Sequence, residues 1–586
     1  LNAEPINPCV GKPSIKQRGG VMKKGNWIKL WCLLIGVAMV MSLVAVATAD
    51  AKLAKKRQVR ELRFVAYSPG THKMWHESQK YMANKMEELG LQIDFRPMQR
   101  AGVLQNLWYS RNFDFGTLYL TGRPTRVDPN MILSKLYHSR DDRIGGYNWA
   151  GYHNPEYDKA IDDSNLYASD LEKRKELIWK AQAIATRDVP IITIVHQMML
   201  DAYNNKKWTG AVSMIGNGLK NVWNWTSMEP LTDDKVLVAA YRDDSGVLNP
   251  TTSHESNVMA CRAVYDTLTH VGPDGAPKPW LAESWTWISP TEIEFNLRKG
   301  HKWHDGKPVT AKDVKFTIDW IKEKKVAYHL VAAGPIKEVK VIDDHTVRYI
   351  LKFPYAPLLA YTGEQIFILP EHIWKDVPEK VGVDDPIMWS PSADGKFIGS
   401  GFLKFDYWRK KDELKLVANK DHFFAPKYDA RIFKYIPSAE AALGRLRKGE
   451  VDMLIDYNGD AMALKKICEA EPNLTMAMEP SIGWYELSMN TRRPPLDDPI
   501  VRRAIAAAIP RDVIAKNIWK GFAIPAYSPT HSMLKPWFNP NVNIYEKELG
   551  LAGAKKILKE AGYEWDSKGL LYYPAGKTNE GWEKKK

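Results

Sequence analysis

Cysteine is scarce in this chain, with four residues among 586. Cys9 and Cys32 lie in or before an apolar N-terminal segment, which leaves Cys261 and Cys468 in the body of the protein. In an oxidising compartment these two thiols are able to pair, and two separate buried thiols are an equal alternative. The count excludes a small disulfide-stapled fold and leaves the state of this pair open.

Motifs of catalysis are also absent. The chain has no GxxxxGK[ST] phosphate loop, no GxSxG nucleophile elbow and no CxxC pair. Carboxylates are numerous, but none forms a spaced pair typical of an acid/base couple. His301 and His304 stand three apart in HKWHDG without the glutamate of an HExxH motif, so we predict no metal site there. We therefore expect no enzyme, no catalytic residues and no cofactor.

Positive charge is concentrated at one end of the chain. The net charge is +14, and the first 57 residues contribute ten Lys and Arg against two acidic residues. Only a small excess of +6 remains for the rest, so a groove that follows a phosphate backbone is not indicated. We predict no nucleic-acid partner.

A basic segment followed by an apolar run begins at Met22. Three lysines precede the apolar residues 30–47, and small residues end the run. This is typical of a secretory signal peptide, which we place at residues 22–49 and expect to be cleaved between 48 and 52. An uncleaved membrane anchor is the alternative, because the run is nearly long enough to span a bilayer. Residues 1–21 carry no pattern and are treated as an upstream extension.

Strands and helices alternate over residues 60–195. Strands are predicted at 62–68, 91–98, 113–120 and 191–197, and helices at 73–90, 101–111 and 170–188. This alternation indicates a mostly parallel sheet covered on both faces.

The texture changes near residue 221. Residues 221–234 are polar and lack periodicity, which predicts a linker. Beyond it, residues 235–241, 292–300, 337–353 and 413–419 alternate apolar and polar side chains as half-exposed strands do, with a hairpin turn at 342–346. Helices follow at 498–509 and 553–563.

Four long segments carry a family likeness: residues 279–321, 397–408, 414–453 and 485–514. In sequence and order they resemble the peptide/nickel group of extracellular solute-binding proteins, the periplasmic receptors of ABC importers. The resemblance implies an α/β, bilobal type II periplasmic-binding-protein fold with an extra β-rich subdomain. It also implies a monomer in the periplasm that binds a small-molecule or peptide ligand and delivers it to an inner-membrane ABC permease. The alternatives are a binder of a metal chelate or oligosaccharide in the same class, or a secreted hydrolase or structural protein.

The order of the segments departs from that family. Its members run from the β-rich front to a motif like residues 554–569 and then continue with a segment like residues 60–228, which here comes first. A circular permutation explains this order, and a tandem-gene or assembly artefact is the alternative. The expected parts are 58–195 in the second lobe, 196–228 as return strands to the first lobe, 229–483 as the first lobe with its β-rich subdomain, and 484–586 as the remainder of the second lobe.

The candidate ligand site centres on the loop YLTGRPTRVDPN, residues 119–130. In dipeptide-binding relatives the matching loop has Trp and Asp where this chain has Leu120 and Arg123, and that Asp pairs with the α-ammonium of the peptide. A guanidinium prefers a carboxylate or phosphate, so the substitution predicts an anionic group on the ligand. The alternative is that Arg123 points to solvent or pairs with a neighbouring acid.

Five further residues complete the predicted site. Two lie in the loop after the first strand of the front lobe, where α/β folds place ligand loops, and one lies near the lobe crossover, where an indole is able to stack on a ligand. With 22 Trp in the chain, a core position is the alternative for each indole. The five are Asn148, Trp149, Ser245, Asn249 and Trp484.

Overall fold

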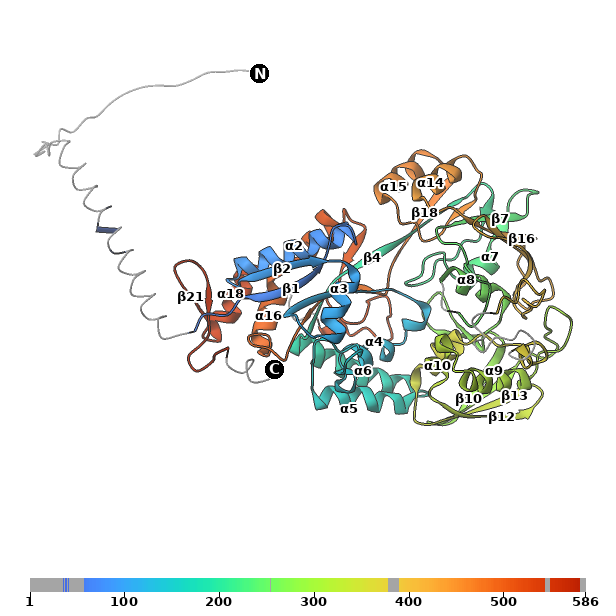
Figure 1. Ribbon diagram of the computed structural model, residues 1–586, viewed down its shortest axis with the longest axis horizontal. Helices are drawn as coiled ribbons and strands as arrows, with labels where there is room; N and C mark the ends of the chain where they lie inside the picture. Colours follow the sequence, from blue (N-terminus) through green and yellow to red (C-terminus); the bar gives the residue numbers. More distant parts are fainter. Residues whose placement is uncertain are drawn as a thin grey trace, which may run out of the picture.

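Two α/β lobes lie side by side along the long axis of the molecule, and strand β4 (Ile191–Asn204) runs from one lobe into the other (Figure 1). The structure is a computed structural model that describes residues 35, 37–38, 41, 57–252, 255–377, 389–542 and 549–579. Within these residues, lobe II comprises 57–196 and 484–579, and lobe I comprises 199–480. The predicted α/β class and bilobal architecture are confirmed.

One sheet of 12 strands continues through both lobes. Its lobe I strands are β14 (Leu403–Arg409), β15 (Glu413–Ala418), β16 (Ala430–Tyr435), β7 (Val236–Tyr241) and β17 (Met453–Leu454). Strand β4 follows, and the lobe II strands are β19 (Trp484–Met489), β3 (Phe115–Leu120), β1 (Leu62–Tyr67) and β2 (Ile93–Met98). Strands β18 (Leu474–Pro480) and β20 (Ala523–Pro525) also pair with β4.

The expectation of a mostly parallel sheet holds only in part. Strand β1 is parallel to β2 and β3, and β7 is parallel to β16 and β17. Strand β19, however, is antiparallel to both β3 and β4. The physical reason is the direction of the two crossings. Strand β4 leads from lobe II into lobe I, whereas β19 begins where the chain returns to lobe II, so these two neighbouring strands run in opposite directions.

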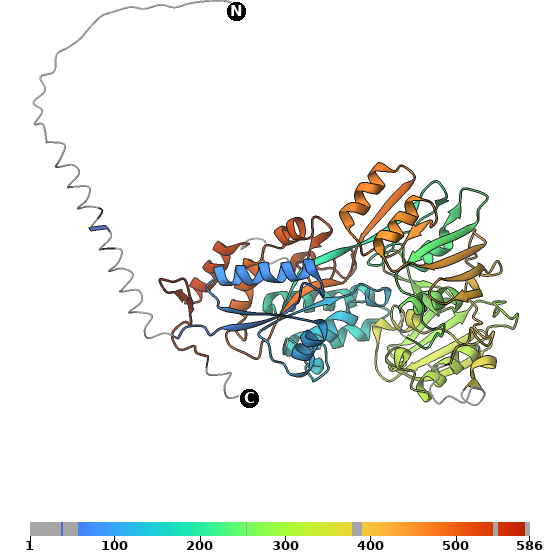
Figure 2. The same cartoon turned by 45° about the horizontal axis from the view of Figure 1, so that its top comes forward.

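Lobe II packs helices on both faces of its part of the sheet. Helix α2 (Lys73–Glu88) lies over one face, and α5 (Pro155–Ser164) and α6 (Leu171–Asp188) lie on the other side (Figure 2). Helix α2 begins at His72, whose Nδ1 accepts the N–H of Trp75 at 3.2 Å. Its apolar stripe of Trp75, Met82 and Met86 is buried, as its helical spacing predicts.

Lobe I carries a second, four-stranded antiparallel sheet in the order β10 (Ala282–Ser289), β11 (Glu292–Leu297), β13 (Thr346–Leu351) and β12 (Ile336–Asp343). Helix α9 (Ala311–Glu323) packs against it, and a capping box between Thr310 and Asp313 fixes the start of that helix. The predicted hairpin between β12 and β13 is confirmed. This sheet is the β-rich part expected from the alternating sequence.

Two chain segments cross between the lobes next to one another. The first is the middle of β4, and the second is the segment 481–483 that joins β18 to β19. The N–H of Ser481 donates to the carbonyl of Gln197 at 2.8 Å, which ties the two crossings together. A Cβ at Gly483 would lie 1.8 Å from the carbonyl oxygen of Leu120, so only glycine fits at this crossing.

The predicted linker at 221–234 is wrong in its first half. Residues Val222–Ser227 form helix α7, and the side chain of Asn221 caps it by accepting the N–H of Asn224. Trp225 is fully buried in the core of lobe I. Strand β6 (Glu229–Pro230) then pairs with β5 (Trp208–Thr209). Burial of this indole overrides the polar, aperiodic character of the segment.

Cys261 is buried in helix α8 (Glu255–Val264) and Cys468 is half-buried in helix α15 (Ala461–Ala470), and both are free thiols. The structure thus decides the question that the sequence left open.

Residues near both limits of the described chain meet on lobe II. The N–H of Val59 donates to the carbonyl of Leu571 at 2.9 Å, and the N–H of Tyr573 donates to the carbonyl of Arg57 at 3.0 Å. The predicted signal peptide falls almost wholly outside the described residues. Among the residues that the structure does describe, no helix combines the length and apolarity needed to cross a bilayer.

Candidate functional site

A cavity of about 310 Å³ lies between the lobes, beside the segments that cross between them. Lobe II contributes the loop 121–125, and β4 contributes residues 197–200. Lobe I contributes the opposite wall, which includes Arg262, Glu364 and Asp456. This volume is in the range of sites for small ligands, and the interface between two lobes is a common place for them.

The lobe II wall is the loop that follows β3. Its backbone approaches the second crossing closely, because the N–H of Gly122 donates to Ser481 Oγ at 3.2 Å. Arg123 is extended, and Pro124 begins the short 3-10 turn η2 (Pro124–Arg126). The loop therefore presents Arg123 at the cavity, with its side chain exposed.

Arg126, at the end of the same turn, is a partly buried cation that the sequence did not single out. Its Nη1 donates to the carbonyl of Thr121 at 2.6 Å and to Thr121 Oγ1 at 3.0 Å. Burial lowers the pKa of this guanidinium, and the charge of Arg123 lowers it further. Within the described part of the chain no carboxylate forms an ion pair with Arg126. The signal available in the sequence was its spacing of three residues from Arg123.

The lobe I wall is built around a buried carboxylate, Glu364 in helix α11 (Thr362–Gln365). One of its oxygens pairs with Arg262 of α8. The other accepts the Nδ1–H of His270 and the N–H of Val271, each at 2.8 Å. Burial raises the pKa of Glu364, but Arg262 and His270 outweigh it and hold the pKa below its ordinary value. The carboxylate is thus ionised and fully engaged at neutral pH.

The base of the cavity rests on Asp201 of β4. Its two oxygens accept the N–H of Leu219 at 2.7 Å and the N–H of Asp456 at 2.8 Å, so it ties together two segments that line the cavity. Burial is the main cause that raises the pKa of Asp201 to about 7. Asp456 in turn forms an ion pair with Lys220 at 3.3 Å. The cavity surface therefore carries Arg123 beside two cation–carboxylate pairs.

Of the predicted site residues, Arg123 lies in the lining of this cavity, and the others lie elsewhere in the described chain. Leu120 belongs to β3 and packs against the lobe II core. Ser245 and Asn249 are buried in the loop after β7, and the amide of Asn249 donates to the carbonyl of Trp389 at 2.9 Å. The side chain of Asn249 also accepts the N–H of Thr251 at 2.8 Å, so it holds the loop in place.

Two predicted residues, Trp149 and Trp484, converge on one carboxylate inside lobe II, and Asn148 precedes the first of them. Trp149 Nε1 donates to Glu486 at 3.1 Å, and Trp484 Nε1 donates to the other oxygen of Glu486 at 3.0 Å. Asn148 holds the turn that contains Trp149, because its amide donates to the carbonyl of Tyr152 and accepts the N–H of Tyr152. Glu486 is fully buried, which is the main cause that raises its pKa to about 7. The two indole N–H groups therefore donate hydrogen bonds to a carboxylate in the core of lobe II.

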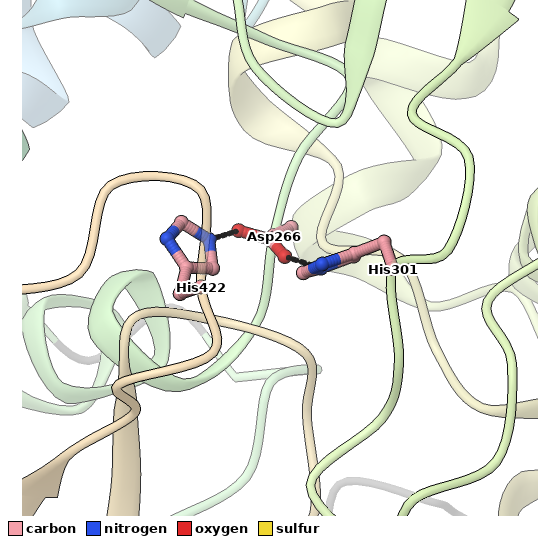
Figure 3. A group of neighbouring side chains, drawn as sticks. All are labelled: Asp266, His301 and His422. Atoms are coloured by element: carbon pink, nitrogen blue, oxygen red, sulfur yellow. Dashed lines mark hydrogen bonds and ion pairs between the residues drawn. The ribbon is translucent and has the colours of Figure 1, made fainter.

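A second cluster of titratable side chains lies in lobe I, where Asp266 stands between His301 and His422 (Figure 3). The two Nε2 atoms lie 2.9 and 3.1 Å from different oxygens of Asp266. Trp280 Nε1 and Ser400 Oγ donate to the same two oxygens, each at 2.7 Å. Four donors thus surround one buried carboxylate.

The hydrogen bonds of this cluster, which we call the hub, join separate segments of lobe I and indicate a structural role. His422 Nδ1 accepts the N–H of Phe424 at 3.0 Å, so its Nε2 carries the proton that it shares with Asp266. Burial raises the pKa of Asp266, but His422 and His301 outweigh it and hold the pKa well below its ordinary value. His304 lies outside the cluster and contacts the carbonyl of Gly401 at 2.9 Å. A metal ion would have to displace donors that already satisfy the carboxylate.

Comparison with known proteins matches residues 276–584 to the family model described as bacterial extracellular solute-binding proteins, family 5 Middle. The chain is 29% identical over 309 residues to the dipeptide-binding protein of Escherichia coli K12, which covers 49% of this chain and 55% of that protein. It is 29% identical over 303 residues to the oligopeptide-binding protein AppA of Bacillus subtilis 168. This match covers 49% of this chain and 53% of AppA. The chain thus spans about half the length of the curated relatives it matches.

Among solved structures, AppA of Bacillus subtilis in complex with a nonapeptide is similar at 22% identity. The similarity covers 58% of this chain and 67% of that one, with a TM-score of 0.41.

Proposed function

The chain belongs to the bacterial extracellular solute-binding proteins of family 5, and on that premise we propose that it captures a small solute between its lobes and delivers it to the permease of an ABC importer. The observation that carries this proposal is the cavity enclosed by both lobes beside the two segments that cross between them. We place the protein in the periplasm, as a monomer whose partners are the solute and the inner-membrane permease.

The two crossings supply a hinge for capture and release. Bending near residues 197–199 and 481–483 opens the cavity without breaking either lobe core, because the main buried clusters of the two lobes lie on either side of these segments. A small apolar cluster joins the lobes: Val127 and Leu534 of lobe II pack with Val271 and Ala360 of lobe I. Its burial favours closure modestly, so bound ligand decides the equilibrium.

The ligand in this proposal carries an anionic group near Arg123. The cavity lining has three cations, Arg123, Lys220 and Arg262, against two carboxylates, Asp456 and Glu364. Both carboxylates are already engaged by Lys220 and Arg262, so a cationic ligand gains little from them. A carboxylate or phosphate on a peptide-like or other small solute suits the guanidinium of Arg123, which binds such groups in bidentate fashion.

The protein in this proposal performs no chemistry on its solute. The family is one of solute-binding proteins. The titratable groups at the cavity, Glu364 and Asp456, are held in ion pairs, which suits recognition and offers no ready acid or base.

We also propose that the chain order is circularly permuted relative to the family. The support is that β1 lies in one sheet with β19, and that residues 57–59 run beside Leu571–Tyr573. A single lobe is thereby completed by two segments far apart in sequence. The parts 58–195, 196–228, 229–483 and 484–586 are the units of this proposal.

The test is to release and identify the ligand that co-purifies from the periplasm of an expressing cell. Mass spectrometry names the solute, calorimetric titration measures its affinity, and small-angle X-ray scattering compares the radius of gyration with and without it. We expect one solute class, tight binding and a more compact bound form. Recovery of no solute, together with an unchanged radius on adding periplasmic extract, would reject the proposal.

A further inference from the structure

The side chain of Asp201 in β4 holds together three segments that line the cavity between the lobes. Residues 198–200 of the same strand line the cavity directly before it. Its Oδ2 accepts the N–H of Leu219 at 2.7 Å, next to the lining residue Lys220. Its Oδ1 accepts the N–H of Asp456 at 2.8 Å, and Asp456 also lines the cavity. One buried carboxylate therefore places both members of the ion pair between Lys220 and Asp456.

Both held segments have backbones shaped to reach this carboxylate. Gly218 has a φ of 56°, and a Cβ at this position would collide with Asp201 Oδ2, so only glycine fits. Asp456 also has a φ of 56°, a conformation that few residues other than glycine adopt. The next N–H, that of Tyr457, donates to the carbonyl of Leu200 at 2.8 Å. Loss of either bond to Asp201 would thus release a segment of the cavity wall.

The charge on Asp201 depends on pH in the neutral range. The side chain is 1% exposed, and burial raises its pKa to about 7. The N–H groups of Asp456 and Leu219 lower this pKa, the charge of Asp456 raises it, and the charge of Lys220 lowers it. The other titratable groups on the surrounding elements are Glu479 on β18, which pairs with β4 at this point, Asp452 just before β17, which is paired with Lys207, and Tyr119 of β3.

Protonation changes what the two oxygens of Asp201 accept. The ionised carboxylate accepts both N–H groups, whereas a protonated carboxyl group carries its proton on one oxygen, which becomes the poorer acceptor. One of the two backbone hydrogen bonds is then weakened. The segment that carries Lys220 or the segment that carries Asp456 loses part of its support on β4.

We propose that Asp201 is a positioning residue of the solute site, which in its ionised form holds the wall with Lys220 and Asp456 in place for binding and in its protonated form loosens that wall and lowers the affinity for solute. This inference rests on the proposed function and adds a means of regulation to it. Because the ionised form binds more tightly, binding displaces the proton from Asp201. Affinity is therefore high above about pH 7 and falls as the pH drops through this value.

The first test reads the two backbone hydrogen bonds directly and needs no solute. Hydrogen exchange of the whole, dialysed protein is followed by mass spectrometry between pH 5.5 and pH 8.5, with rates corrected for the pH dependence of chemical exchange. In the wild type, the amide of Leu219, that of Asp456 or both should be protected at least tenfold more at pH 8.5 than at pH 5.5. In Asp201→Asn the protection of both amides should not change with pH.

The second test reads the coupling to binding. The solute released from the native protein by unfolding serves as the probe in titration calorimetry. Its affinity for the wild type should be at least threefold higher at pH 8 than at pH 6, and binding at pH 7 should release protons, as measured in buffers of different ionisation enthalpy. For Asp201→Asn the affinity should change less with pH, and the proton release that Asp201 supplies should be lost.

The difference between wild type and Asp201→Asn isolates this carboxyl group, because the two proteins share every other titratable group. Asp319→Asn is the matched control, since Asp319 lies half exposed on α9 in the same lobe, and it should reproduce the wild-type profiles. If Asp201→Asn does not fold, the wild-type exchange profile still decides.

Equal protection of both amides at pH 5.5 and pH 8.5 in the wild type would overturn the inference. An affinity that Asp201→Asn lowers by the same factor at every pH would also overturn it, because it would show a purely structural role. In both cases a recovered solute leaves the proposed function standing. If neither solute recovery nor compaction is found, the proposed function fails, whatever the exchange profile shows.

Discussion

Glu486 should make the stability of this protein fall as the pH rises through neutrality. The perturbation that isolates it is Glu486→Gln, which removes the titrating group and keeps its shape. Burial raises the pKa of Glu486 from 4.5 to about 7, so the folded protein binds a proton more tightly than the unfolded chain. The stabilisation is therefore fully present below about pH 4.5 and is lost as the pH rises through about 7.

The magnitude follows from these two pKa values. Between pH 5 and pH 8 the linkage relation assigns a loss of about 2.5 kcal/mol in the free energy of unfolding to this one carboxyl. The substitution Glu486→Gln also places an amide N–H against one of the two indole N–H groups, a cost of about 1–3 kcal/mol that does not vary with pH. Only the difference in pH dependence between variant and wild type is diagnostic.

The assay is urea unfolding at pH 5, 6, 7 and 8, followed by circular dichroism and by total tryptophan fluorescence, to which Trp149 and Trp484 beside Glu486 contribute. We expect the variant curve to be flatter than wild type by about 2.5 kcal/mol over this range. Glu172→Gln is the matched control, because that side chain is 84% exposed on α6. Parallel curves for wild type and Glu486→Gln would refute the reasoning.

Three further predictions concern the ligand, the hub and the chain order. Arg123→Ala should weaken binding of the co-purified solute at least tenfold and Arg123→Lys should recover part of it, and unchanged affinity by calorimetry would show that Arg123 is only a surface residue. Asp266→Asn should destabilise lobe I by about 3 kcal/mol or more, since it breaks a buried charged network. A chelator should leave the thermal midpoint of the wild type unchanged. A midpoint that falls with chelator would identify a metal site instead. A rearranged gene that begins at residue 235, joins residue 579 to residue 57 through a short linker and ends at residue 228 should fold and bind like the wild type; an insoluble product, with a soluble parent expressed in parallel, would count against the permutation.

Local structure was accessible from the sequence because it depends on neighbouring residues. The strand at 62–68 and the helix at 73–90 follow from apolar spacing and a glycine stop, and both are present as β1 and α2. The loop after β3 was predicted to belong to the ligand site, and Arg123 of this loop lines the cavity between the lobes. A loop at the end of a buried strand is constrained by the sheet, so its place is predictable from the chain alone.

Contacts between distant segments were decided only by the tertiary structure. Trp149 and Trp484 had equal standing as ligand contacts in the sequence, yet they converge on Glu486 from positions 337 and 2 residues away. The polar segment after Asn221 forms a helix because Trp225 packs in the buried core of lobe I. No periodicity within either segment encodes such a partner, because burial depends on what the rest of the chain brings near.

The charged lining of the cavity between the lobes shows the same division. Arg123 was visible as a substitution in a recognised loop, whereas Arg262, Glu364 and Asp456 looked like ordinary charged residues. They line one cavity with Arg123 because β4 runs on through both lobes and places lobe I opposite the loop after β3. The sequence by itself determined the elements, the family and one charged loop. The tertiary structure decided which charges share a cavity, since that depends on how two lobes close and not on spacing along the chain.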